Sequence, residues 1–375
     1  MRPMRWREAL IAIAALFLVS RGVLVLIALL LESSIPLGYH GPTYATGPVL
    51  SSLTGSDSLY LLGIAAEGYH AEPVRQAFRD WAFFPLYPLV TRVFSVLTLG
   101  NLAVAGVIVS NVAFVGSLAV LYALAVRHLD HDRAVRSLAF VALAPGAVAF
   151  AMAYTDSLFL LLAAGAFLAA EQRRWALMAL LYGLATLTRL QGVLLGIPLA
   201  ILIAGANMPT PDGWRSIAAW RTSRLAWLAA GPLAFGIFAA YLGVTFGDPL
   251  GMFTAQQAWS QIGQEPIGQV TQVLDRFNPI VLLLVGVLCL YLFLFVYRRR
   301  DRLPAAYTAL ALLTVLTSLA TGRLQSGARY FAVAWPFAWV LAGRRAAWFE
   351  LLGLAGFASL FVMHAFLHFT QALAP

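Results

Sequence analysis

The amino-acid sequence predicts an all-α integral membrane protein with about 11 transmembrane helices. Hydrophobic residues make up 61% of the 375-residue chain and charged residues only 11%, whereas soluble domains carry about 25% charged residues. Apolar stretches close to the roughly 20 residues that a spanning helix needs recur along the whole chain. Arginine clusters lie in the short loops between these stretches, as expected for a polytopic protein.

Each apolar stretch is expected to form one span. The first follows the basic opening "MRPMRWREAL" and is too long for the apolar core of a signal peptide, so we interpret it as a membrane helix. The expected spans lie at about 9–31, 102–126, 135–152, 156–171, 175–188, 191–206, 225–246, 279–297, 304–321, 330–343 and 347–369.

The distribution of arginine predicts the orientation of these spans. Lys is absent, so all 25 basic residues are Arg. Most of them precede the first span or lie in alternate loops, which the positive-inside rule assigns to the cytoplasm. We therefore expect a multi-pass protein with its N-terminus in the cytoplasm and its C-terminus outside, in the plasma membrane if the source is bacterial.

Two longer loops fall on the outer side, at about 32–100 and 247–278. Within the first, "LYLLGIAAEGY" and "PLYPLVTRVFSVLTL" are amphipathic or apolar but too short to span. They are typical of helices that lie in the membrane interface. No internal repeat separates the parts, so residues 1–375 are expected to form a single membrane domain.

Composition also excludes several classes of function. The net charge of +9 would suit nucleic acid, but the topology already accounts for the positions of the Arg residues, so no nucleic-acid partner is expected. The single cysteine, Cys289, rules out a disulfide within the chain and a cysteine-based metal site. No phosphate-binding glycine loop, dinucleotide fingerprint or Ser–His–Asp pattern is present.

Two outer carboxylates stand among apolar neighbours at predicted helix starts. Asp57 lies in "GSDSLYLL" and Asp156 in "YTDSLF". An Asp at such a position caps the helix by accepting free backbone N–H groups. For Asp57 capping and catalysis both remain open, and for Asp156 capping alone is favoured.

Several arginines fall within spans or on the outer side, against the positive-inside rule. Arg323, Arg329 and Arg189 have no acidic neighbour in sequence, which suggests either that they snorkel to the membrane boundary or that they bind an anion. A guanidinium binds phosphate through two hydrogen bonds and stays charged, so the phosphate of a lipid carrier would suit them. Arg21 lies in the middle of the first span and is expected to face a cavity or a partner, for which an outer-loop carboxylate is one candidate.

The aromatic run "DWAFFPLYPL" in the first outer loop has two interpretations. It suits an aromatic belt at the membrane interface, and it equally suits the wall of a site for a sugar or a lipid.

Taken in order, several stretches resemble the PIG-V-like mannosyltransferases, membrane glycosyltransferases with the multi-span C-type fold. "SDSLYLLGIAAEGY" keeps Asp57, Tyr60, Gly68 and Tyr69 of the family's first-loop pattern, and Ser56 stands where the family has Trp. The other matching stretches are "FFPLYPL" at 83–89, "YTDSLFLLLA" at 154–163, "LTRLQGVLL" at 187–195, "GDPLGMF" at 247–253 and "ARYFAVAWP" at 328–336.

The resemblance implies a glycosyltransferase that moves a sugar, with mannose expected, from a polyprenyl-phosphate donor to a lipid-linked or glycan acceptor. It implies transfer on the non-cytoplasmic face with inversion at the anomeric carbon and Asp57 as the general base. No cofactor is required by these residues, although a divalent cation is compatible with them. Substrate binding is then expected from Arg329, Arg323, Arg189, Tyr60, Tyr69, His70, Asp156 and Tyr330.

A lipid or solute transporter, or a flippase without catalytic activity, is the alternative. Transporters carry repeats and polar groups on broken helices near the membrane midplane. In this sequence the polar candidates gather in outer loops, which favours the enzyme.

Overall fold

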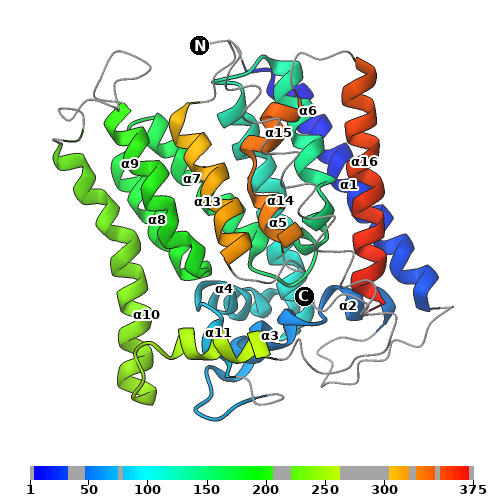
Figure 1. Cartoon of the computed structure of the whole chain (residues 1–375). Helices are drawn as coiled ribbons and strands as arrows, with labels where there is room; N and C mark the ends of the chain where they lie inside the picture. Colours follow the sequence, from blue (N-terminus) through cyan, green and yellow to red (C-terminus); the bar gives the residue numbers. More distant parts are fainter. Residues whose placement is uncertain are drawn as a thin grey trace.

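The computed structural model describes residues 4–32, 47–74, 79–205, 220, 222–261, 304–320, 327–342 and 347–370, and the regular structure in these ranges is helical throughout. Figure 1 shows long helices standing side by side, with short helices lying across one end of the bundle. The predicted span at 279–297 lies outside the described residues.

The long and medium helices follow the apolar stretches of the sequence. They are α1 (Trp6–Glu32), α5 (Leu102–Ala125), α6 (His131–Ala142), α7 (Asp156–Glu171), α8 (Trp175–Thr188), α9 (Gly196–Gly205), α10 (Ala230–Phe246), α13 (Ala305–Ala320) and α16 (Ala347–Phe369). The short helices are α2 (Pro48–Leu53), α3 (Asp57–Glu67), α4 (Leu86–Ser95), α11 (Gly251–Gln261), α14 (Gly327–Val333) and α15 (Pro336–Leu341). Single 3-10 turns η1 (Asp80–Ala82), η2 (Val96–Thr98), η3 (Pro145–Phe150), η4 (Leu190–Leu195) and η7 (Ser223–Ala229) complete the set.

Among the described residues, four helical segments are long and apolar enough to cross a membrane: Trp6–Leu31, Leu102–Ala125, Ser223–Phe246 and Glu350–Phe369. Shorter apolar helices stand among them, so the chain is a multi-span integral membrane protein. The spans expected at 156–171, 175–188, 304–321 and 347–369 coincide with helices to within one residue.

Two expected spans are interrupted, so the prediction of continuous helices there was wrong. The segment 135–152 contains the end of α6 and the turn η3, which begins at Pro145. The segment 330–343 contains α14 and α15, and α15 begins at Pro336. Proline has no backbone N–H to continue a helix but is tolerated in a first turn, so in both places the helix stops and a new one starts.

The two breaks pack directly on each other. A Cβ on Gly146 in η3 would lie 2.1 Å from the backbone oxygen of Ala328 in α14. Only glycine permits so close an approach. This contact brings Arg329, the next residue of α14, to the start of α7.

The core of the bundle lies where α5, α7 and η3 pack together. Phe114, Phe150 and Phe167 are fully buried there, and the rings of Phe114 and Phe150 stack with their centroids 5.1 Å apart. At the far end of α7, Glu171 accepts hydrogen bonds from Tyr307 of α13 and pairs with Arg127. The helix that begins at Asp156 is thus tied to its neighbours at both ends.

Candidate active site

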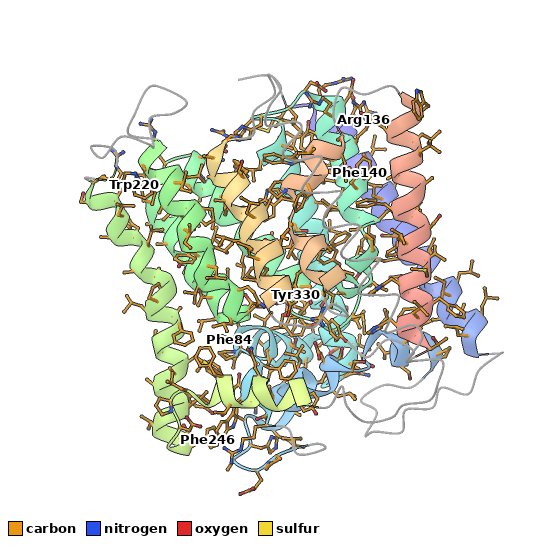
Figure 2. The ribbon with its side chains drawn as sticks, viewed as in Figure 1. Phe84, Arg136, Phe140, Trp220, Phe246 and Tyr330 are labelled. Carbon is orange, nitrogen blue, oxygen red and sulfur yellow. The ribbon has the colours of Figure 1, made fainter. Side chains whose placement is uncertain are left out.

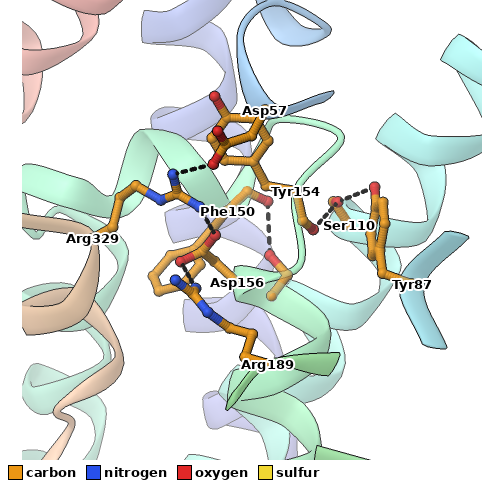
Figure 3. A network of polar contacts seen from close by, with 9 residues as sticks. Asp57, Tyr87, Ser110, Phe150, Tyr154, Asp156, Arg189 and Arg329 are labelled. Atoms are coloured by element: carbon orange, nitrogen blue, oxygen red, sulfur yellow. Dashed lines mark hydrogen bonds and ion pairs between the residues drawn. The ribbon is translucent and has the colours of Figure 1, made fainter. Parts of the chain in front are cut away.

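Four charged side chains from distant parts of the sequence meet inside the bundle (Figure 3). Asp57 is the first residue of α3, and Asp156 is the first residue of α7. Arg329 belongs to α14, and Arg189 follows the last residue of α8. The junction therefore depends on the close packing of α14 against η3 described above.

The four side chains form one chain of ion pairs. Nη1 of Arg329 donates to Oδ2 of Asp57 over 2.8 Å, and Nη2 donates to Oδ2 of Asp156 over 2.9 Å. The other oxygen of Asp156 accepts a hydrogen bond from Nη1 of Arg189. Two cations and two anions cancel, so the cluster carries no net charge, which is the condition for keeping such groups inside a protein.

The members of this cluster differ in burial. The side chain of Asp156 is 0% exposed and uses both oxygens on arginines. The side chain of Asp57 is 16% exposed and bonds to Arg329. Asp156 is therefore the fixed centre of the cluster, and Asp57 is its accessible edge.

Capping does not explain either carboxylate. Asp57 and Asp156 are the first helical residues, the N-caps are Ser56 and Thr155, and neither cap residue makes a side-chain capping bond. The interpretation of Asp156 as a cap was wrong because its oxygens point to the two arginines. The positive end of each helix dipole still favours a carboxylate at that position.

Arg189 and Arg329, which have no acidic neighbour in sequence, have acidic partners in the fold. Asp156 is 33 residues from Arg189 and 173 residues from Arg329 in the sequence, and Asp57 is 272 residues from Arg329. No local sequence pattern can reveal partners at such separations. Arg323, the third arginine of the set, lies outside the described residues.

Within the described part of the chain, the partners of Arg21 are not carboxylates. Its Nε donates to Oδ1 of Asn111 over 2.7 Å, and its Nη2 donates to the carbonyl oxygen of Phe150 over 2.8 Å. The guanidinium also lies 4.3 Å from the ring centroid of Phe114. A neutral amide, a carbonyl and an aromatic face thus satisfy this cation within its helix bundle.

Tyr154 is a member of the site that the sequence did not single out. Its ring is fully buried and lies 4.4 Å from the guanidinium carbon of Arg329. A cation held over an aromatic face is stabilised by the ring quadrupole and fixed in orientation. The only available signal was the position of Tyr154 two residues before Asp156.

Three of the predicted binding residues organise the first outer loop. The ring of Tyr60 stacks on Phe83 with centroids 5.2 Å apart, and the hydroxyl of Tyr69 donates to the carbonyl of Phe83 over 2.6 Å. His70 bonds through Nδ1 to Oδ2 of Asp80 over 2.9 Å. Through these contacts the three side chains hold the first outer loop together.

The His70–Asp80 pair shifts the titration of both groups. The hydrogen bond to Asp80 raises the pKa of His70 above its usual 6.5, against an opposing effect of burial. Burial raises the pKa of Asp80, and the hydrogen bonds from His70 work in the opposite direction. The indole of Trp81 donates to the carbonyl of His70 over 2.7 Å, which joins the pair to the aromatic run.

Most aromatic side chains of the run "DWAFFPLYPL" lie inside the protein. Trp81, Phe84 and Tyr87 are all buried, and Tyr87 donates to the carbonyl of Gly106 over 2.8 Å. The run packs the outer loop onto the helix bundle.

A cavity of about 30 Å³ lies beside the cluster, with Arg189 at its edge. Its lining is mostly apolar and comes from α7, η4, α13 and α14, including Phe159, Leu310 and Val333. Tyr330 lines it as well, and its ring centroid lies 5.2 Å from the guanidinium carbon of Arg189. Arg189 therefore joins an apolar recess to the charged cluster.

The described residues do not fit a divalent cation. Among them no three His, Cys, Asp or Glu side chains lie close enough to share a metal ion. The guanidinium of Arg329 bonds to both Asp57 and Asp156, so it takes up the coordinating oxygens that face each other.

Comparison with known proteins identifies the relatives of this chain. Residues 43–200 match the sequence model of the family described as Mannosyltransferase (PIG-V), a segment that contains both Asp57 and Asp156. No curated protein matched the full sequence.

Two solved structures share the fold. The structure of ArnT from Cupriavidus metallidurans bound to undecaprenyl phosphate superimposes with a TM-score of 0.50 and 16% identity, over 96% of this chain and 76% of that one. The Archaeoglobus fulgidus oligosaccharyltransferase in complex with zinc and sulfate gives a TM-score of 0.50 and 15% identity. That match covers 92% of this chain but only 53% of the oligosaccharyltransferase, so the present chain spans about half its length.

The predicted C-type architecture is thus confirmed at the level of the fold. Residues 43–200 are thus similar in sequence to the Mannosyltransferase (PIG-V) family, and the fold of the chain is similar to that of ArnT.

Proposed function

We propose that the protein transfers a sugar, mannose, from a polyprenyl-phosphate donor to a hydroxyl of a lipid-linked or glycan acceptor on the non-cytoplasmic face of the membrane. Transfer inverts the anomeric carbon, and Asp57 is the general base. The domain comprises the whole chain, with eleven spans. The observation that carries the proposal is the cluster in which a partly accessible carboxylate, Asp57, lies beside two arginines.

The position of the cluster in the bundle supports a site on the non-cytoplasmic side of the membrane. Arg136 lies at the end of the bundle near the chain's beginning (Figure 2), where it pairs with Glu350 over 2.9 Å. The short helices α3, α4 and α11 lie at the opposite end (Figure 1). Since arginine-rich loops stay in the cytoplasm, the α3 end that bears Asp57 faces outside.

The surface of α4 and η2 supports a membrane-interface position for that end. Val93 and Val96 are 72% and 76% exposed, and the neighbouring Leu89 and Leu97 are exposed as well. An exposed apolar face on a short outer helix is suited to the headgroup boundary of the bilayer.

The arginines and the cavity support a lipid-phosphate donor. Guanidinium groups bind phosphate through two hydrogen bonds, and Arg189 also lines a small cavity with mostly apolar walls. ArnT, which shares the fold, is reported bound to undecaprenyl phosphate.

The reaction follows from these roles. The acceptor oxygen attacks the anomeric carbon as Asp57 takes its proton. The bond from the anomeric carbon to the phosphate oxygen breaks, and the leaving phosphate keeps the bonding electrons. Arg329 and Arg189 stabilise the negative charge that develops on it. Attack opposite the leaving group inverts the anomeric centre.

The test compares Asp57→Asn with Glu72→Gln, which removes an exposed outer carboxylate away from the cluster. Transfer by purified protein with a polyprenyl-phosphate mannose donor should fall by about 10²–10⁴ for Asp57→Asn, the usual range for loss of a general base. Glu72→Gln should keep normal turnover. Near-normal turnover of folded Asp57→Asn would exclude the base assignment, and lipid flux without any transfer would favour a flippase.

A further inference from the structure

The proposed base and the proposed phosphate-binding cation are bonded to each other. Oδ2 of Asp57 accepts from Nη1 of Arg329 over 2.8 Å, and Nη2 of the same arginine is held by Asp156 over 2.9 Å. Both terminal nitrogens of Arg329 are therefore in use, one on each carboxylate. The side of Oδ2 of Asp57 that faces Arg329 is therefore occupied by an arginine N–H.

The charge balance limits how an anion can enter. The cluster of Asp57, Asp156, Arg189 and Arg329 is neutral and largely buried. An added phosphate would leave it with uncompensated negative charge, which is costly inside a protein. One carboxylate must then give up its place on an arginine.

Asp57 is the carboxylate that can move. Asp156 is 0% exposed and held by two arginines, whereas Asp57 is 16% exposed and held by one. Arg329 itself is fixed by Asp156 and by the ring of Tyr154 beneath it, 4.4 Å away. Displacing Asp57 therefore leaves the arginine in position for a new ligand.

The backbone conformation of the residue before Asp57 also supports a movable Asp57. Ser56 has φ 57° and ψ −124°, a conformation that residues other than glycine rarely adopt. Such conformations persist where surrounding contacts hold them. The residue that follows, Asp57, is held by the ion pair with Arg329.

We propose that the donor phosphate and Asp57 compete for Nη1 of Arg329, so that binding of the donor frees Asp57 to act as the base. This inference rests on the proposed function. It makes the enzyme ordered, with the lipid-phosphate donor binding before the acceptor hydroxyl is activated. Without a donor, Asp57 stays bonded to Arg329.

The experiment measures the binding of undecaprenyl phosphate to the full-length protein in nanodiscs. Removing the competing charge with Asp57→Asn or Asp57→Ala should lower the dissociation constant by about tenfold, within the usual range of coupling between two ligands. The matched control Glu72→Gln should bind as the wild type does. In the double variant Asp57→Asn/Arg329→Gln the gain should disappear, because it depends on the freed arginine.

A parallel series with inorganic phosphate locates the effect. Competition at the head group predicts that Asp57→Asn tightens binding of both probes by a similar factor, whereas a gain confined to the lipid would overturn the proposal. Unchanged or weaker binding by folded Asp57→Asn and Asp57→Ala would also overturn it, as would a gain that survives Arg329→Gln. These outcomes are separate from those of the turnover assay, since loss of transfer with unchanged affinity refutes the competition and leaves the base assignment intact.

Discussion

Substitution of Asp156 by Asn tests whether the buried cluster stabilises the fold. The side chain of Asp156 is 0% exposed, and its two oxygens bond to Arg189 and Arg329. In Asp156→Asn one carboxylate oxygen becomes an NH₂ group, which is a donor and faces an arginine N–H donor. In addition, Asp57 is then the one negative charge left in the cluster for two arginines. We therefore expect folded protein with reduced stability.

The magnitude follows from burial. Removing one partner of a buried ion pair costs about 3–5 kcal/mol because the other charge is left uncompensated. Asp57→Asn removes one charge-assisted hydrogen bond at a position 16% exposed, for which about 1.5–3 kcal/mol is the corresponding range. Asp156→Asn is thus expected to destabilise the protein by roughly 2 kcal/mol more than Asp57→Asn.

The assay is equilibrium unfolding in mixed detergent micelles, read by intrinsic tryptophan fluorescence. The double variant Asp156→Asn/Arg189→Gln restores neutrality and should recover part of the loss, since sites in one network are not additive. If Asp156→Asn unfolds like the wild type while Asp57→Asn is clearly destabilised, the assignment of Asp156 as the fixed centre is refuted.

Two further predictions concern the packing and the outer loop. Gly146→Ala places a Cβ 2.1 Å from the backbone oxygen of Ala328, so unfolding should become easier by about 1–3 kcal/mol or more and transfer should fall. The control Gly236→Ala, with no atom within 4 Å of its Cβ, should keep normal transfer, and equal behaviour of the two variants would contradict the close approach. The raised pKa of His70 means that its bond to Asp80 adds stability below the unfolded pKa near 6.5 and loses it as pH rises through the folded pKa. Limited proteolysis of the first outer loop should therefore accelerate in the wild type as the pH rises above about 6.5, whereas pH-independent cleavage there, or the same acceleration in His70→Gln, would refute this role.

The helices themselves were largely predictable. Apolar length and turn residues are local properties, so segments such as 156–171 and 175–188 were located to the residue. The two interrupted segments were mispredicted because hydropathy averages over the breaks before Pro145 and Pro336. A proline inside an apolar stretch was the signal available for both.

The candidate site was predictable only in its parts. Asp57, Asp156, Arg189 and Arg329 were all singled out as unusual residues, yet their pairing was missed. Asp57 and Arg329 are 272 residues apart in the sequence, so the residues around one give no information about the other. Arg189 and Arg329 have no acidic neighbours in sequence, whereas in the fold they have acidic partners.

The sequence by itself determined that the chain is a helical membrane protein of a glycosyltransferase type, because hydropathy, arginine placement and short motifs are written along one dimension. Tertiary structure alone decided that Asp57 is held by Arg329, that Asp156 is the buried centre, and that Tyr154 lies under the arginine. The physical reason is that burial makes these contacts strong, and burial arises only when η3 and α14 pack closely enough to leave room for Gly146 and nothing larger.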